Sequence, residues 1–190
     1  MTPASDLGPG AIVPPSVIET VRLRWENIPF EPENFIGYVG QRNLELSRLS
    51  KDLGADLYLA FACCHQLNGA IETFHRTYGG RIAAIGRRFG ESQSFADELT
   101  QRVFEKLFVR HTDKEPGISQ YRAEAPLSAW VNSVARRIAF RQVKSARPER
   151  LLNEELLAQE ISDVCDQELQ LLREQQLELL VADIGDLLRK

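Results

Sequence analysis

Apolar side chains recur at helical spacing through the middle of this chain, and that periodicity restricts its fold more than any other feature. One set follows at steps of four residues and would line one helix face: Phe95, Leu99, Val103 and Leu107. A second set continues the spacing: Leu127, Val131, Val134 and Ile138. No segment alternates apolar and polar residues as a half-buried strand does. The sequence therefore predicts an all-α fold, a compact helical bundle.

Local signals mark where the expected helices begin and end. We expect the firmest helices over these ranges: 56–68, 70–90, 94–110 and 126–147. Ser94, three residues before Asp97, resembles a capping box, and Pro126 suits the first turn of a helix. Gly79 and Gly80 would allow the second helix to bend.

The two ends of the chain differ from this middle. Six of the nine prolines precede residue 33, which makes the first stretch a poor candidate for regular structure. Residues 17–25 would form a short helix or a strand, and Gly37 and Gly40 weaken a helical pattern over 34–50. We predict three parts: a partly irregular N-terminal extension (1–55), a helical domain (56–150) and an acidic, leucine-rich helical tail (151–190).

Charge is unevenly distributed in this chain, whose net charge is −4. Residues 69–150 hold 15 basic and 9 acidic side chains, a net of +6. Residues 1–68 hold 5 basic and 8 acidic side chains, and residues 151–190 hold 3 and 10. A basic middle between acidic ends predicts a polyanion-binding segment, so a pI near 5.5 is no argument against DNA binding.

Hydropathy and cysteine content predict a cytoplasmic protein. No apolar run reaches the roughly 20 residues that cross a bilayer, and the N-terminus lacks the basic and apolar pattern of a secretion signal. Three cysteines are an odd number and fit a reducing compartment. Cys63, Cys64 and His65 lack the spaced second ligand pair of a zinc site. We therefore interpret the cysteines, including Cys165, as buried apolar side chains and expect no metal and no cofactor.

Residues 70–150 resemble a known family through the order and spacing of three motifs. These are "AIETFHRTYGGRIAAIGRRFG" at 70–90, "FADELTQRVFEKLF" at 95–108 and "ISQYRAEAPLSAWVNSVARRIAFRQVKSARPER" at 118–150. Together they are similar to conserved region 2 of bacterial RNA polymerase sigma factors of the extracytoplasmic-function type (group IV). The match covers about 80 of 190 residues. It implies a helical domain that binds core polymerase and recognises and melts the promoter −10 element.

The resemblance places a polymerase-binding face on the second motif. In the family, the exposed face of this helix docks on the coiled coil of the largest polymerase subunit. The matching side chains here are Asp97, Glu98, Gln101, Arg102 and Glu105. A glutamate commonly follows the glutamine in the family, and Arg102 takes its place here. A solvated helix face without a partner is the alternative interpretation.

The third motif matches the part of the family that holds the opened −10 element. Capture of single-stranded bases needs an aromatic surface and nearby cations, which Tyr121 and Arg122 would provide. Trp130 would line this site or anchor the core. Five further cations would contact the DNA backbone: Arg136, Arg137, Arg141, Lys144 and Arg147. Because Arg137 stands where the family commonly has an asparagine that reads the −10 element, promoter specificity does not carry over.

The family's second domain, which reads the −35 element, has no full counterpart. After Arg150 only 40 residues remain, and they resemble a linker and the first helix of that domain. We expect a fragment, a naturally short relative or a tail with another role. The tail, with a net charge of −7, would then cover the basic middle or associate with another copy.

Two other classes of function compete with this interpretation. An enzyme is not expected, because the chain has no Gly-rich phosphate loop, nucleophile elbow or metal-ligand pair. The histidines are scattered at His65, His75 and His111. A sigma-like helical adaptor is the stronger rival: it would bind polymerase or an anti-sigma partner without initiating transcription. No membrane is expected as a partner.

Overall fold

The computed structural model describes residues 13–44, 49–90, 92–110 and 115–146, and every regular element in these ranges is helical. The elements in chain order are α1 (Pro15–Arg24), α2 (Pro32–Gln41), α3 (Lys51–Cys64), α4 (Ala70–Gly90), α5 (Gln93–Phe108), the 3-10 helix η2 (Gly117–Gln120) and α6 (Leu127–Ala146). The prediction of an all-α fold is confirmed. None of the helices described is long and apolar enough to cross a membrane.

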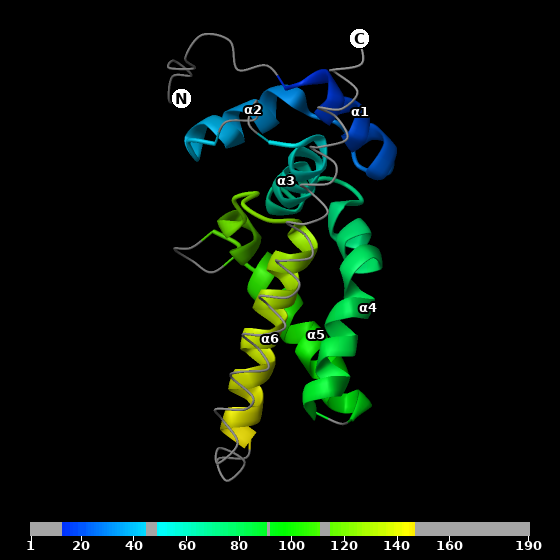
Figure 1. Cartoon of the computed structure of the whole chain (residues 1–190), viewed down its shortest axis with the longest axis vertical. Coiled ribbons are helices and arrows are strands. Elements are labelled where there is room, and N and C mark those ends of the chain that lie inside the picture. The colour runs from blue at the N-terminus through cyan, green and yellow to red at the C-terminus, as the bar shows by residue number, and fades with distance from the viewer. Residues whose placement is uncertain (1–12, 45–48, 91, 111–114, 147–190) are drawn as a thin grey trace, which may run out of the picture.

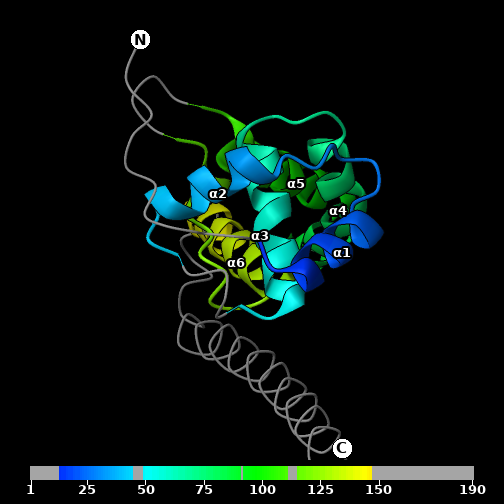
Figure 2. The same ribbon diagram turned by 90° about the horizontal axis from the view of Figure 1, so that it is seen from above.

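Three long helices, α4, α5 and α6, pack against one another, and α3 lies across one end of them (Figure 1). α1 and α2 contact α3 and flank it in the view along the long axis (Figure 2). The segment with η2 returns from α5 to α3 before α6 begins. The loop that was expected to hold the −10 element therefore contacts α3, the same helix on which α1 and α2 pack.

α3 is the centre of the hydrophobic core. Every residue from Gly54 to Cys64 is buried, so this helix has no solvated stripe along most of its length. α1 packs on it closely: a Cβ at Gly54 would lie 2.7 Å from Cγ2 of Val17. Nε1 of Trp25, just after α1, donates a hydrogen bond to the carbonyl of Ala55 at 2.9 Å. The N-terminal helices are thus part of the same core as the rest of the described chain.

The predicted domain boundary between residues 55 and 56 is wrong, because it falls inside α3, whose residues on both sides share one core. The N-terminal part is also more regular than expected. Residues 17–25 mostly belong to the helix α1, and the pattern over 34–50 becomes the shorter α2. Pro15 and Pro32 occupy the first positions of these helices. A backbone N–H there would have no partner within the helix, so proline removes no hydrogen bond. The predicted tail, 151–190, lies outside the described residues.

Serine caps set the start of two helices, and neither is at the predicted residue. Ser50 Oγ accepts a backbone N–H three residues further on at 3.3 Å and starts α3, so the predicted start at Asp56 is wrong. Ser92 Oγ accepts the N–H of Phe95 at 3.2 Å and caps α5 in place of Ser94. By contrast, α4 covers the predicted range, 70–90, as one helix.

Candidate functional site

The side chains expected to bind polymerase lie together on one exposed face of α5. All five are exposed: Asp97, Glu98, Gln101, Arg102 and Glu105. The buried residues of the same helix are Ala96, Leu99, Val103 and Leu107. Because these apolar side chains fix the rotation of α5 about its axis, the five polar ones must point outward. We call this set the α5 face.

Polar contacts within α5 order part of this face. Arg102 donates to Oε1 of Glu98 from Nε at 3.0 Å and from Nη2 at 2.7 Å, and Gln93 Nε2 donates to Oδ1 of Asp97 at 2.7 Å. The Arg102 and Glu98 side chains are 54% and 51% exposed, so their pairing contributes only roughly 0.3–0.5 kcal/mol to stability. These side chains can therefore exchange their partners for those of another molecule at little loss of stability.

Tyr121 is buried, which contradicts its predicted role as a base-stacking surface. It is 1% exposed, and its hydroxyl donates to the carbonyl of Ala125 at 2.7 Å. Burial raises the pKa of this phenol above its usual range. Trp130 lies edge-on to the ring with centroids 5.7 Å apart, and it packs partly buried against the core. Of the two interpretations of Trp130, the structure favours the core anchor.

The loop that carries Tyr121 is attached to the end of α2 by polar contacts. Arg42 follows α2, and its Nη2 pairs with Oε2 of Glu115 at 2.7 Å. Arg122 is exposed, and its Nη2 donates to the carbonyl of Arg42 at 3.2 Å. Arg122, which was predicted to contact a captured base, therefore points toward the end of α2.

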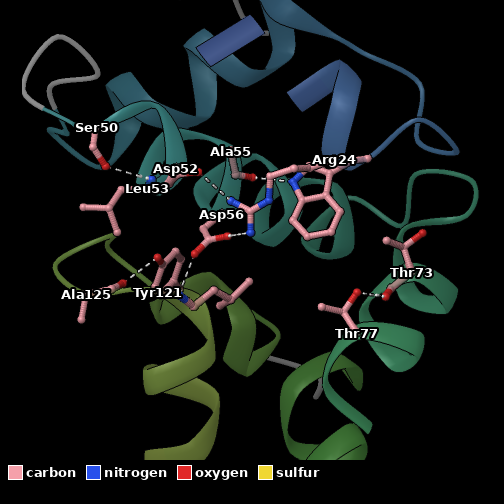
Figure 3. A network of polar contacts seen from close by, with 12 residues as sticks. Arg24, Ser50, Asp52, Leu53, Ala55, Asp56, Thr73, Thr77, Tyr121 and Ala125 are labelled. Carbon is pink, nitrogen blue, oxygen red and sulfur yellow. Dashed lines mark hydrogen bonds and ion pairs between the residues drawn. The ribbon is translucent and has the colours of Figure 1, made fainter. Parts of the chain in front are cut away.

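A buried carboxylate, Asp56, joins three helices (Figure 3). Its Oδ2 accepts the backbone N–H of Leu127 at 2.9 Å, and its Oδ1 pairs with Nη2 of Arg24 at 3.0 Å. Arg24 also reaches Oδ1 of Asp52 at 3.3 Å. Desolvation raises the pKa of Asp56, opposed by the hydrogen bond from Leu127 and by the charge of Arg24. Asp56 thus satisfies an otherwise free N–H at the start of α6.

Sequence reasoning missed this role of Asp56. Asp56 and Leu127 are 71 positions apart, and an acidic residue before an apolar segment is also typical of a helix start. One signal was available: Asp56 is the only charged residue between positions 53 and 75 except Glu72. An acidic residue inside a long apolar segment indicates a buried, paired carboxylate.

The cations predicted on α6 divide into a buried and an exposed group. Arg136 is only 8% exposed, so its predicted place in a solvent-facing cationic surface is wrong. Arg137, Arg141 and Lys144 are exposed and share one side of the helix at steps of four and three. Arg137 Nε donates to a carbonyl of its own helix at 3.3 Å. We call these three residues the α6 face; Arg147 lies outside the described residues.

The cysteines of α3 are buried, as predicted. Cys63 and Cys64 are both free thiols in the core. Desolvation raises the pKa of each thiol, which disfavours the reactive thiolate at neutral pH. The third cysteine, Cys165, lies outside the described residues.

Comparison with known proteins leaves the family of the chain open. No family model, curated protein or solved structure matches it. The function must therefore be argued from the motifs of residues 70–150 and from the α5 and α6 faces.

Proposed function

We propose that this protein is a transcription initiation factor of the bacterial sigma type. It would dock on core RNA polymerase through the α5 face and contact promoter DNA through the α6 face. The observation that carries the proposal is the α5 face. All five residues that the family resemblance selects for polymerase binding are exposed on one side of one helix.

The α5 face has suitable chemistry for docking on another helical surface. It offers acidic, amide and basic groups on one rigid helix, whose opposite side is held in the core. Charged groups at the rim of an interface steer association and select the partner more than they add affinity. An apolar patch is not required for such a contact if the partner presents complementary charges.

The DNA-binding part of the proposal rests on fewer residues than the motif suggests. Arg137, Arg141 and Lys144 remain as exposed cations that would contact phosphates. Because Tyr121 is buried, a captured base must use another surface of the loop or of α6.

One specific observation favours a second candidate, the sigma-like adaptor that binds polymerase without opening DNA. The loop expected to capture bases is tied to the end of α2, because Arg122 donates to the carbonyl of Arg42 and Glu115, just before the loop, pairs with the Arg42 side chain. An adaptor would keep the α5 face and lose base capture. The two candidates therefore differ in DNA binding and agree in polymerase binding.

Binding assays with bacterial core RNA polymerase and a single-stranded −10-type oligonucleotide test both candidates. The double substitution Asp97→Ala and Gln101→Ala should weaken polymerase binding about tenfold, because two polar contacts of about 0.5–1.5 kcal/mol each are lost. The matched control is Glu33→Ala with Gln41→Ala, at exposed positions of α2.

Each outcome has one interpretation. Polymerase and oligonucleotide binding together support the initiation factor, and polymerase binding alone supports the adaptor. Absence of polymerase binding by the unmodified protein, or an equal effect of the α5 and α2 variants, would refute the sigma proposal.

A further inference from the structure

We propose that the exposed side of α4 binds the phosphate backbone of double-stranded DNA. This inference is separate from the α5 and α6 faces and does not depend on the sigma assignment. Four exposed arginines form the surface, which we call the arginine face: Arg76, Arg81, Arg87 and Arg88. The segment 73–90 that contains them has no acidic residue.

The charges of the arginine face are not balanced by nearby carboxylates of the described chain, whereas several other arginines have such a partner. Arg24, Arg42 and Arg102 each pair with a carboxylate on their own or a neighbouring element. No described residue forms an ion pair or hydrogen bond with any arginine of the arginine face. The chain has 27 acidic and 23 basic side chains, so carboxylates are not scarce. Four uncompensated cations on one helix therefore indicate an anionic ligand from outside this part of the chain.

The spacing of the arginine face follows from helix geometry. At 1.5 Å per residue, the first and last arginines are about 18 Å apart along α4. At 100° per residue, Arg76 and Arg87 lie within about 20° of one another around the axis, and so do Arg81 and Arg88. The two rows are roughly 120° apart. They border a strip of small exposed residues: Thr77, Gly80 and Ala84.

This shape suits a long, regularly charged ligand. No atom lies within 4 Å of a Cβ placed at Gly80, so nothing described blocks approach to the strip between the rows. Duplex DNA carries one phosphate charge per about 1.7 Å of axis, and the arginine face would therefore run past roughly ten phosphates. Guanidinium groups bind phosphate oxygens with two parallel hydrogen bonds. An acidic protein would need carboxylates at matching positions, whereas a duplex offers phosphates along its whole length.

Fluorescence anisotropy with the full chain and labelled duplexes of two unrelated sequences tests this inference. Replacing the four arginines together by glutamine should weaken binding to both duplexes alike, by roughly tenfold or more at low salt. The slope of log affinity against log salt should fall by about one for each phosphate contact removed. Replacement of the same arginines by lysine keeps the charges and should restore most of the affinity and the slope.

A charge-matched control removes four exposed cations from other elements: Arg22→Gln, Lys51→Gln, Lys106→Gln and Arg110→Gln. It should retain duplex binding nearly in full, and circular dichroism should show all three variants folded. Equal loss in the arginine-face and control variants would overturn the inference, because net charge alone would then explain it. Absence of duplex binding by the unmodified chain, or binding of polyglutamate in preference to DNA, would also overturn it.

Discussion

At the scale of single residues, Asp56 has the most demanding environment in the described chain. It is 5% exposed, and a buried carboxylate is stable only when its charge is paired and its oxygens accept hydrogen bonds. Both oxygens of Asp56 have a partner, but Arg24 is itself 37% exposed. Solvent therefore screens the ion pair, and the pKa of Asp56 stays above its usual value of 3.8 because desolvation outweighs the favourable contacts.

This raised pKa of Asp56 predicts a pH dependence of stability. A group with a higher pKa in the folded state binds more protons there, so its contribution is largest below pH 3.8 and declines as the pH rises through the folded-state pKa. Asp56→Asn cannot titrate. Urea unfolding at pH 4 and pH 7 should therefore show the wild-type protein gaining stability relative to Asp56→Asn as the pH falls. A relative loss at pH 4 would contradict the direction of the shift.

At the scale of helices, the close contact of α1 with α3 depends on the absence of a side chain at Gly54. A methyl group there would lie 2.7 and 2.9 Å from the two Cγ atoms of Val17, which is 1% exposed and β-branched. Val17 has few rotamers to which it can move. We expect Gly54→Ala to reduce the free energy of unfolding by about 1–3 kcal/mol, measured by urea unfolding with circular dichroism.

Gly37 provides the matched control for Gly54→Ala. It lies inside α2, and a Cβ there would have nothing within 4 Å. Gly37→Ala should increase stability by about 0.5–1 kcal/mol, because alanine loses less backbone entropy in a helix than glycine. An equal gain in stability for Gly54→Ala would show that α1 and α3 lie further apart than the 2.7 Å distance to Val17 implies.

Helices were predicted accurately where they are amphipathic and less accurately where they are not. α4, α5 and α6 have one buried and one exposed side, so their apolar periodicity was readable. α3 is buried almost throughout, and a helix without a polar side shows no period that could mark its start. For α1 and α2, prolines suggested irregular structure, although a proline at a first helical position is compatible with a helix.

At the scale of the whole molecule, the candidate surfaces were predictable only where they depend on one helix. The five residues of the α5 face follow from helical spacing and are all exposed as expected. The loop with Tyr121 was not predictable in the same way, because its conformation depends on α2 and α3. Contacts such as Arg42 with Glu115 join residues 73 positions apart, and no local pattern encodes them.

Because α1 and α2 contribute to the core that α3 shares with the long helices, we predict that residues 56–150 cannot fold as an independent domain. Such a fragment would lack nine buried core residues, and six of them are these large apolar side chains: Val17, Val21, Trp25, Ile28, Phe35 and Val39. Each of these six contributes about 1.5–3 kcal/mol by burial, so their sum, roughly 9–18 kcal/mol, is comparable to the whole stability of about 5–15 kcal/mol of a typical domain. The fragment should lose near-ultraviolet circular dichroism and cooperative urea unfolding, whereas residues 13–150, which retain this core, should keep both. A cooperative transition of the 56–150 fragment at the midpoint of the longer chain would show that α1 and α2 are an appendage.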